Sequence, residues 1–374
     1  MTVDQICDAI GAAHSLKRHL RIAGAATWLD SGRPVHAENT LSIAALSGVV
    51  DYVPGDLTIT VRGGTPLSEI QRITAEQGQW LSLNPFGNPG GTIGATVATA
   101  SSGPLVHGFG SIRDLVVGIE LVTGEGRLIR GGGRVVKNVA GFDLVRLVTG
   151  SWGTLGVITE VTLRLYSIPK VSVTLAVAMP SDARQLRDRL RALYTLPINA
   201  HAIELIDAQL ASQIGFSAEP MVLMNIGGTE PSVTAQRRIV WALGGVNEIP
   251  AEVWDALRIV DGRGTAVVRL SGAPTALADM WLHAQRSVGG VDGAGAHATI
   301  SRGVVRCILP VTARDEIGRL AHPGIAARTV YERLPGNLWR EHSPSVTEDR
   351  LSRGIKRVFD PAGILNPGIL GPIQ

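Results

Sequence analysis

The sequence has little cysteine. Cys7 and Cys307 are the only two among 374 residues, and they form no C-x-x-C motif. A Cys-ligated iron–sulfur cluster needs about four thiolates, so this chain does not hold one by itself. A disulfide framework is equally excluded, and a reducing compartment fits the composition.

Aromatic and charged residues are also scarce. Aromatics make up 4% of the chain, charged residues 18%, and the formal net charge is +3. Because no run of Lys and Arg is interleaved with aromatics, nucleic-acid binding is excluded. No stretch of about 18 apolar residues occurs, which excludes a membrane-spanning helix. The first twenty residues lack the apolar core of a signal peptide. We therefore expect a cytoplasmic protein.

Several catalytic fingerprints are absent as well. No G-x-G-x-x-G motif follows a predicted strand, which excludes the nicotinamide Rossmann fingerprint. No G-x-x-x-x-G-K-[ST] occurs, so the chain is not a P-loop protein. The missing H-E-x-x-H and G-x-S-x-G motifs argue against zinc proteases and α/β-hydrolases.

Glycine, in contrast, is abundant. The chain holds 45 glycines in 374 residues, about 12%, whereas ~7% is typical. Its 45% of hydrophobic residues suffices for a large core. Three segments concentrate the glycines: 84–103, 130–150 and 150–160. In the first, a glycine-rich turn feeds a small-residue helix, an arrangement whose backbone N–H groups can bind phosphate oxygens. The alternative is a tightly packed Gly/Ala helix against a sheet, or corners whose glycines take positive φ.

Periodicity and capping signals predict a mixed α and β chain without an internal repeat. Helices are expected at 4–13, 66–77, 182–195, 231–243, 275–287 and 346–358, and strands at 18–23, 57–62, 114–122, 156–166, 171–178, 221–226, 265–270 and 303–309. The glycines thin after Pro169, so we place a domain boundary at 168–170. This gives a first domain at 1–168, a second at 169–345, and a tail at 346–374 that packs back on the chain.

The motifs resemble those of a known family. The string KNVAGFDLVRLVTGSWGTLGVITEVTLRL, residues 137–165, resembles the FAD-binding domain of the vanillyl-alcohol-oxidase superfamily, also called the PCMH-type domain. Residues 137–143, which include Lys137, Asn138, Gly141 and Asp143, are most similar to the FAD-binding subunits of glycolate oxidases. FDPAGILNPG, residues 359–368, matches the closing motif of the family. The strong match covers 57–168 and 355–368.

The resemblance implies a fold class and a cofactor. The fold is α+β: a PCMH-type domain of two α/β subdomains binds FAD, and a C-terminal α+β domain caps the flavin. The first phosphate loop falls at 21–28, where only Gly24 remains of the usual glycine pair and Ala25 and Ala26 follow. The resemblance implies cofactor contacts at Gly24, Gly90, Gly91, Thr92, Gly94, Ala95, Ser101, Ser102, Gly156, Val157, Ile158 and Asn366. No His or Cys stands in the first loop, and His107 is the only His near the second, so non-covalent FAD is expected.

The reaction that the resemblance implies is oxidation of a small 2-hydroxy acid such as glycolate. A carboxylate substrate favours an arginine clamp, because guanidinium binds carboxylate through two parallel hydrogen bonds. The catalytic candidates are Arg302, Arg306, His297 and His342, near Trp339 and Arg340. If 300–309 is extended, Arg302 and Arg306 share one strand face. The alternative is that each arginine is solvated surface.

One departure from the family separates two hypotheses. Hydroxy-acid dehydrogenases of the superfamily often carry an H-x-G-D-G-N metal motif in the cap, and this chain has none, so no metal is expected. In one hypothesis the chain is an oxidoreductase acting on its own flavin, for example a D-lactate oxidase. In the other it is a flavin-binding or electron-relay subunit, with a second FAD-binding subunit and an iron–sulfur subunit as partners.

Overall fold

The structure is a computed structural model that describes residues 1–374 except 134–142, 263, 322–323, 343–349 and 372–374. Lys137, Asn138 and Gly141 therefore lie outside the described residues. The chain divides into two compact units. The first comprises Met1–Ser102, Gly110–Ile168 and Ser345–Gln374, and the second comprises Gly103–Phe109 and Pro169–Pro344. None of the described helices is both long and apolar enough to cross a bilayer.

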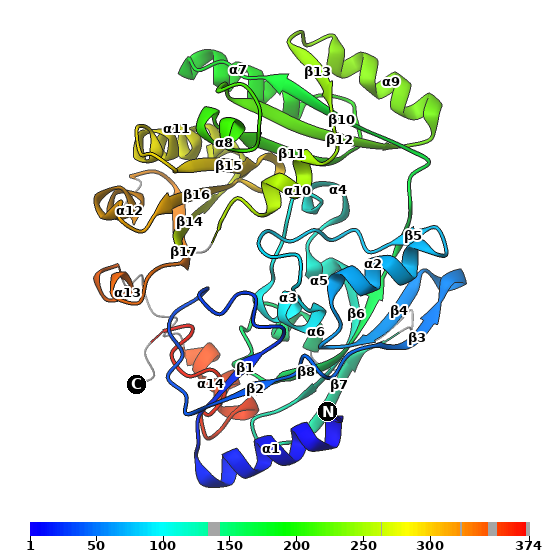
Figure 1. Ribbon diagram of the computed structural model, residues 1–374, viewed down its shortest axis with the longest axis vertical. Coiled ribbons are helices and arrows are strands. Elements are labelled where there is room, and N and C mark those ends of the chain that lie inside the picture. Colours follow the sequence, from blue (N-terminus) through cyan, green and yellow to red (C-terminus); the bar gives the residue numbers. More distant parts are fainter. Residues whose placement is uncertain (134–142, 263, 322–323, 343–349, 372–374) are drawn as a thin grey trace. The chain divides into compact units, whose positions relative to one another are not determined.

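A five-stranded antiparallel sheet forms the centre of the first unit (Figure 1). Its order is β3 (Val49–Val53), β4 (Thr58–Arg62), β8 (Val157–Arg164), β6 (Val116–Val122), β7 (Leu128–Gly132). The helices are α2 (Leu67–Ala75), α3 (Ile93–Thr99), α5 (Ile112–Leu115) and α6 (Leu144–Val148), and β5 (Gln79–Trp80) pairs with β9 (Tyr166–Ser167). Ile59, Val61, Val161 and Leu163 are fully buried in this core. The alternation of Val161, Leu163 and Leu165 predicts this burial correctly.

A second layer of the first unit joins the two ends of the chain. The parallel pair β1 (Leu20–Ala23) and β2 (Asn39–Ser42) packs with α1 (Val3–Leu16), and α14 (Arg350–Phe359) precedes a buried turn. Lys356 on α14 donates to the carbonyl oxygen of Thr154 at 2.7 Å and to Asp360 at 2.5 Å. The Asp360 carboxylate accepts the amides of Ile364 and Leu365. The apolar tail is thus held by an ion pair whose carboxylate is buried.

An eight-stranded antiparallel sheet forms the second unit (Figure 1). Its order is β13 (Val246–Ile249), β10 (Val171–Ala178), β12 (Met221–Gly228), β11 (Ala200–Ile206), β15 (Gly295–Thr299), β16 (Val304–Pro310), β14 (Thr265–Gly272), β17 (Ala327–Arg333). The helices are α7 (Ala183–Tyr194), α8 (Ala208–Gln213), α9 (Glu230–Trp241), α10 (Val253–Arg258), α11 (Leu277–Val288), α12 (Arg314–Ala321) and α13 (Leu338–Glu341).

This sheet is built from two copies of one topology. β10-α7-β11-β12-α9-β13 and β14-α11-β15-β16-α12-β17 are both β-α-β-β-α-β units of the ferredoxin-like type. The two halves meet where β11 pairs with β15. The expectation that the chain has no internal repeat is therefore wrong at the level of topology.

Residues 103–109 differ from the sequence-based assignment, which placed them in the first domain. They include α4 (Val106–Phe109), which packs on β11 in the second unit. A Cβ on Gly108 would stand 2.9 Å from the carbonyl oxygen of Ala200, and the rings of Phe109 and His201 lie 4.9 Å apart. These contacts join residues that are far apart in sequence, so the local sequence does not predict that 103–109 belong to the second unit.

Candidate functional site

Five separate stretches of the first unit line one pocket, which we call the glycine pocket. Its lining residues are 21–29, Ser31, Ile43, Gly94, Ala95, Ala98, Thr99, Trp152, Gly153, Gly156, Ile158, Asn366 and Ile369. The loop after β1, the first turns of α3, the turn before β8 and the C-terminal segment therefore meet here. Three of these stretches carry the glycine-rich or closing motifs of the sequence.

Close approach of backbone explains several glycines around the glycine pocket. A Cβ on Gly24 would overlap the hydroxyl of Thr92, which precedes α3. A Cβ on Gly94 would stand 2.7 Å from the carbonyl oxygen of Gly63, which accepts the Gly94 amide at 2.8 Å. No larger residue fits at either place without moving backbone. The loop after β1, the residues after β4 and the start of α3 therefore approach one another so closely that a side chain on Gly24 or Gly94 would not fit.

The loop after β1 contains a strained residue. Ala26 has φ 58°, in the left-handed region where residues with a Cβ are disfavoured. The family usually has a glycine pair in this loop, whereas Ala25 and Ala26 follow Gly24 here. Backbone strain of this kind gathers at ligand-binding loops and persists only where the surroundings hold it.

Asn366 fixes the C-terminal wall of the pocket. Its side-chain oxygen accepts the Ile22 amide at 2.8 Å, and its side-chain nitrogen donates to the carbonyl oxygen of Trp152 at 2.7 Å. Its φ is 45°, a conformation that Asn tolerates better than most residues. A Cβ on Gly153 would stand 2.7 Å from the same side-chain nitrogen. One side chain thus joins β1 to the turn before β8.

Three buried polar atoms around the pocket have no hydrogen-bond partner within the described part of the chain. They are the indole nitrogen of Trp28 and the hydroxyls of Ser31 and Thr92. A buried polar atom left unpaired costs about 1–3 kcal/mol, so native structures rarely contain one without a ligand or water. Three donors beside a glycine-lined wall fit a ligand rich in oxygen, such as the pyrophosphate and ribityl chain of a dinucleotide.

The structure brings half of the predicted cofactor residues to this pocket. Gly24, Gly94, Ala95, Gly156, Ile158 and Asn366 line it, whereas Gly90, Gly91, Thr92, Ser101, Ser102 and Val157 do not. Ser101 and Ser102 bond near the end of α3, to the Thr99 hydroxyl at 2.6 Å and the Ala100 carbonyl at 3.4 Å. Val157 is paired within the sheet, opposite Val122.

The amides of the second glycine loop are engaged within the protein. Gly90 donates to the Asn88 side chain at 2.8 Å, and Gly91 to the Asn88 carbonyl at 3.3 Å. Gly91 does not have positive φ, and a Cβ on it would meet nothing closer than 3.7 Å. Gly91 therefore does not need a conformation available only to glycine. Thr92 does not line the pocket, but its buried hydroxyl has no partner among the described residues.

Sequence reasoning missed the two tryptophans of the pocket. Trp28 lies in the loop after β1, and Trp152 lies between the glycines of the third rich segment with φ 55°. The sequence did contain an indication of this. A bulky aromatic residue within a glycine-rich loop belongs to no helix or strand that would bury it in the core, so a pocket wall is a natural place for it. Residue type alone did not predict that Trp28 and Trp152 would line the same pocket.

In the second unit, charged residues meet across strands in what we call the charge cluster. His297 on β15 lies opposite Arg306 on β16, which lies opposite Arg269 on β14. Glu332 on β17 pairs with Arg306 at 2.8 Å and with Arg269 at 3.1 Å. Arg306 also pairs with Asp261 at 3.2 Å. Although burial works against it, Arg306 and Arg269 lower the pKa of Glu332.

The charge cluster continues to β11 through His297. Its Nδ1 lies 3.2 Å from Glu204, and its Nε2 lies 3.3 Å from an Arg306 nitrogen. Because arginine only donates, this contact makes Nε2 an acceptor and places the proton on Nδ1, facing Glu204. Thr299 donates to Glu204 at 2.5 Å. His297, Glu204 and Arg306 are 1%, 0% and 4% exposed, so the cluster is buried and internally paired.

The two candidate arginines do not share a strand face. Ile300–Arg302 forms a 3-10 turn, and β16 begins only at Val304. Arg302 is exposed and donates to the Val106 carbonyl at 3.2 Å, where its charge and, more strongly, burial lower the pKa of His107. The extended reading of 300–309 is therefore wrong at its start. Gly303, with φ 58°, ends the turn and allows the strand to begin.

The remaining candidates also separate. His342 follows α13 and lines a cavity on the helical side of the second unit, whereas Trp339 is buried in the core and Arg340 is exposed. Of the described residues, no three His, Cys, Asp or Glu side chains come together as a cation site. The catalytic candidates thus lie in three different environments and do not form one constellation.

Comparison with known proteins agrees with the cofactor predicted from the motifs. Residues 1–132 match the family described as FAD binding domain. The chain superposes on p-cresol methylhydroxylase with a TM-score of 0.74 over 99% of this chain and 87% of the other, at 15% identity. It thus has an FAD-binding domain and the PCMH-type α+β fold, as predicted.

Two curated relatives define the resemblance further. The chain is 29% identical to glycolate oxidase subunit GlcE of Escherichia coli over 365 residues, which cover 97% of this chain and 95% of the relative. It is 34% identical over 191 residues to a mitochondrial D-lactate dehydrogenase (cytochrome) of Arabidopsis thaliana, covering 50% and 33% of the two chains. The first similarity runs through both units, and confirms the resemblance read from the motifs.

Proposed function

We propose that the glycine pocket holds the FAD, bound without a covalent link. Trp28, Ser31 and Thr92 donate hydrogen bonds to the oxygen-rich part of the cofactor, which supplies partners for the three unpaired atoms. Gly24 and Gly94 keep the wall thin enough for close approach. None of the residues that line the pocket, all of them described, is His or Cys, the residue types that attach flavins covalently in the superfamily.

We further propose that the chain oxidises, or helps to oxidise, a small 2-hydroxy acid such as glycolate. The observation that carries this proposal is the similarity to the GlcE subunit over nearly the whole of both chains. When bound, FAD supplies hydride acceptance and the release of single electrons. The protein's own part is to position the acid and to hold the proton that leaves its hydroxyl.

The charge cluster bears on which residues could bind the acid. Arg306 is already paired with Asp261 and Glu332, and a guanidinium engaged by two carboxylates has little capacity left for a third. Arg302 is exposed but lies on a turn, with its side chain on the Val106 carbonyl. Arg306 is engaged on both sides, and Arg302 lies on a turn with one donor on a backbone carbonyl, so the two arginines do not form one clamp. This favours a substrate clamp supplied by another chain.

The proposed assembly is therefore a subunit in a complex. Its partners would be a second FAD-binding subunit and an iron–sulfur subunit, because two cysteines provide no in-chain cluster for onward electron transfer. Such partners would also provide the proposed link of a cytoplasmic chain to the inner membrane. The second candidate is a self-sufficient 2-hydroxy-acid oxidase, favoured by the similarity to D-lactate dehydrogenase through one third of that protein.

Steady-state turnover separates the two candidates. The purified, FAD-loaded chain is tested with glycolate and D-lactate, first with dioxygen and then with a dye acceptor. The subunit proposal expects turnover well below the typical enzyme range of about 1–1000 per second, restored when the native complex is purified with its partners. Turnover within that range by the chain alone would overturn the subunit proposal and leave the self-sufficient enzyme.

Cofactor attachment has its own measurement. The purified protein should be yellow, and acid precipitation should release free FAD into the supernatant. Flavin that stays on the precipitate would contradict non-covalent binding. A colourless protein that takes up no FAD on dialysis would contradict the pocket assignment.

A further inference from the structure

The helix α14 (Arg350–Phe359) has hydrophobic side chains on its outer face (Figure 1). Leu351 and Val358 are 77% and 72% exposed, which makes them the two most exposed of the large hydrophobic side chains in the described part of the chain. They stand two turns apart on one side of the helix, and the exposed Gly354 lies between them on that side. We call these three residues the apolar ridge. Large hydrophobic side chains that gather on one exposed face indicate a surface that another molecule covers.

A row of arginines runs beside the apolar ridge. Arg350, Arg353 and Arg357 follow one another at steps of three and four residues, so they share one side of α14, and all three are exposed. Among the described residues, the one ion pair of α14 is made by Lys356 instead. The helix carries no acid, and the charge of Arg350 meets the positive end of the helix dipole, which is unfavourable. Stability of the helix alone therefore does not account for these arginines.

The opposite side of α14 is fixed to the first unit. Its residues are half-buried and are Ser352, Ile355, Lys356 and Phe359. Lys356 donates to the carbonyl oxygens of Thr154 at 2.7 Å and Leu365 at 3.2 Å. These two residues are next in sequence to Gly153 and Asn366, which line the glycine pocket. The inner side of α14 is thus held against the segments that form the pocket wall, which leaves the apolar ridge facing solvent.

Gly354 makes the apolar ridge low at its middle. Glycine is unfavourable inside a helix, and apart from the helix's own backbone nothing lies within 4 Å of the place that a Cβ would take here. No contact within the described chain therefore calls for a glycine. A residue without a side chain does let a second backbone approach closely. The ridge fits an element that crosses α14 at Gly354 and contacts Leu351 and Val358 on either side.

We propose that the outer face of α14 is the docking surface for another subunit, one whose apolar groove is bordered by Asp and Glu side chains. This proposal rests on the proposed function as a subunit of a complex, and it names the surface and the chemistry of the partner. Leu351 and Val358 enter the groove, and the acids pair with the row of arginines. The partner then lies about 10 Å, the diameter of a helix, from the wall of the glycine pocket and so close to the proposed FAD.

Two other occupants fit this face less well. A second copy of the chain, bound through the same face, would bring two rows of arginines together without an acid between them. An anionic membrane attracts arginines, but two large hydrophobic side chains on a helix of ten residues bury little area in a bilayer. The pattern of charge and apolar area therefore favours an acidic protein surface.

The test uses the native complex, isolated through a tag on the FAD-loaded full chain, with its subunits separated at high salt. Interferometry then measures the binding of the separated partner to variants of the chain. Arg353→Glu together with Arg357→Glu should raise the dissociation constant about tenfold or more and reduce its dependence on salt, because glutamates repel an acidic rim. Val358→Ser should raise it about tenfold at every salt concentration, because it removes only apolar contact.

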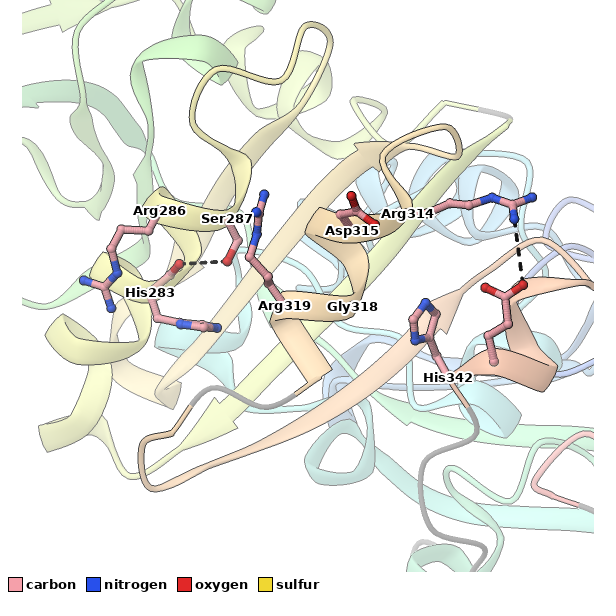
Figure 2. Close-up of a pocket in the computed structure, with 9 residues that line it drawn as sticks. His283, Arg286, Ser287, Arg314, Asp315, Gly318, Arg319 and His342 are labelled. Atoms are coloured by element: carbon pink, nitrogen blue, oxygen red, sulfur yellow. Dashed lines mark hydrogen bonds and ion pairs between the residues drawn. The ribbon is translucent and has the colours of Figure 1, made fainter.

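Two further variants are controls for folding and for charge. Because Gly354 faces open space, Gly354→Leu should not lower the melting temperature or the FAD content, although it should weaken partner binding about tenfold. Figure 2 shows Arg286 on α11 in the second unit. It is exposed and makes no ion pair with a described residue, but α11 exposes no large hydrophobic side chain beside it. Arg286→Glu should therefore bind the partner as the parent does.

The outcomes separate this proposal from the subunit role on which it rests. Co-purification of an unidentified protein does not by itself support the docking surface. Equal affinities of the parent and the α14 variants for the partner would overturn the docking surface and leave the subunit role in place. A chain that purifies alone would overturn both. If the double glutamate variant instead abolishes a homodimer, or binding to vesicles of phosphatidylcholine and phosphatidylserine, the face belongs to a second copy or a membrane and the proposal is wrong.

Discussion

The glycine pocket and the charge cluster treat buried polar groups in opposite ways. Around the glycine pocket, the Trp28 indole and the Ser31 and Thr92 hydroxyls have no partner among the described residues. In the charge cluster, Arg306 and Glu332 are paired on both sides. Unpaired donors beside thin backbone indicate a ligand, whereas paired charges stabilise the sheet that contains them. Burial of polar residues alone would not have told a binding site from a structural cluster.

Removing the centre of the charge cluster should have the largest effect. Arg306→Ala removes the arginine that Asp261 and Glu332 share, which leaves Glu332 with Arg269 and Asp261 with Arg333 at 4.0 Å. Breaking a buried pair in this way costs about 3–5 kcal/mol. Urea unfolding of the FAD-loaded chain measures the loss. Arg302→Ala, which removes one bond of an exposed arginine, should change stability by less than about 1 kcal/mol. Equal losses in the free energy of unfolding would contradict the claim that the paired Arg306 stabilises the sheet more than the exposed Arg302 does.

Two glycine variants should separate cofactor binding from stability in the first unit. Gly24→Ala pushes a methyl group into Thr92, so the FAD dissociation constant should rise about tenfold or more, which is about 1.4 kcal/mol. Gly91→Ala meets only ordinary contacts and should bind FAD almost as the parent does. Fluorescence titration of the released and rebound cofactor measures both. Comparable weakening in the two would mean that the loops act as one unit.

Lowering the pH should destabilise the second unit through protonation of Glu332. Its pKa is lowered in the folded protein, so the stability it contributes is present above its unfolded value of about 4.3 and is lost as the pH falls through the lower folded value. The stability difference between the parent and Glu332→Gln should therefore be full at pH 7 and shrink below about pH 4. Urea midpoints at pH 3, 4, 5 and 7 test this. A constant difference would show that Glu332 is not ionised where it is buried.

The smallest effect is expected at Ala26. Ala26→Gly relieves a left-handed φ of 58° and should gain about 1 kcal/mol in the folded state, partly offset by the greater freedom of glycine in the unfolded chain. Thermal unfolding without added FAD measures the gain. If the melting temperature drops, the alanine conformation is not strained, and the departure from the family's glycine has no cost.

Much of the fold could be predicted from local pattern. The strand at 171–178 is found as predicted, and helices expected at 182–195 and 231–243 lie at Ala183–Tyr194 and Glu230–Trp241. β11 and β15 were missed, because AHAIELI and GAHAT lack the alternation of half-buried strands. They are the two strands at the join of the repeated halves, and β15 is buried throughout. These segments form strands because of their central place in the sheet and not because of their amino-acid composition.

The site was less predictable than the fold. Gly24, Gly156 and Asn366 could be placed by motif, because each matches a family segment. The partners of Arg306 could not, since Asp261 and Glu332 come from a loop and a strand that only the sheet order brings together. An arginine therefore looked available in the sequence, although two carboxylates engage it in the structure.

Asn366 has a consequence for the order in which the protein is made. Its side chain joins Ile22, near the beginning of the chain, to Trp152, so the wall of the glycine pocket is complete only once residue 366 has left the ribosome. Domains that fold during synthesis usually assemble from the N-terminus onward. Here the first unit must wait for the segment around Asn366, so the proposed binding of FAD in the glycine pocket would follow synthesis of that segment. A nascent chain stalled before Asn366 should be unable to retain FAD, however well its first sheet has formed.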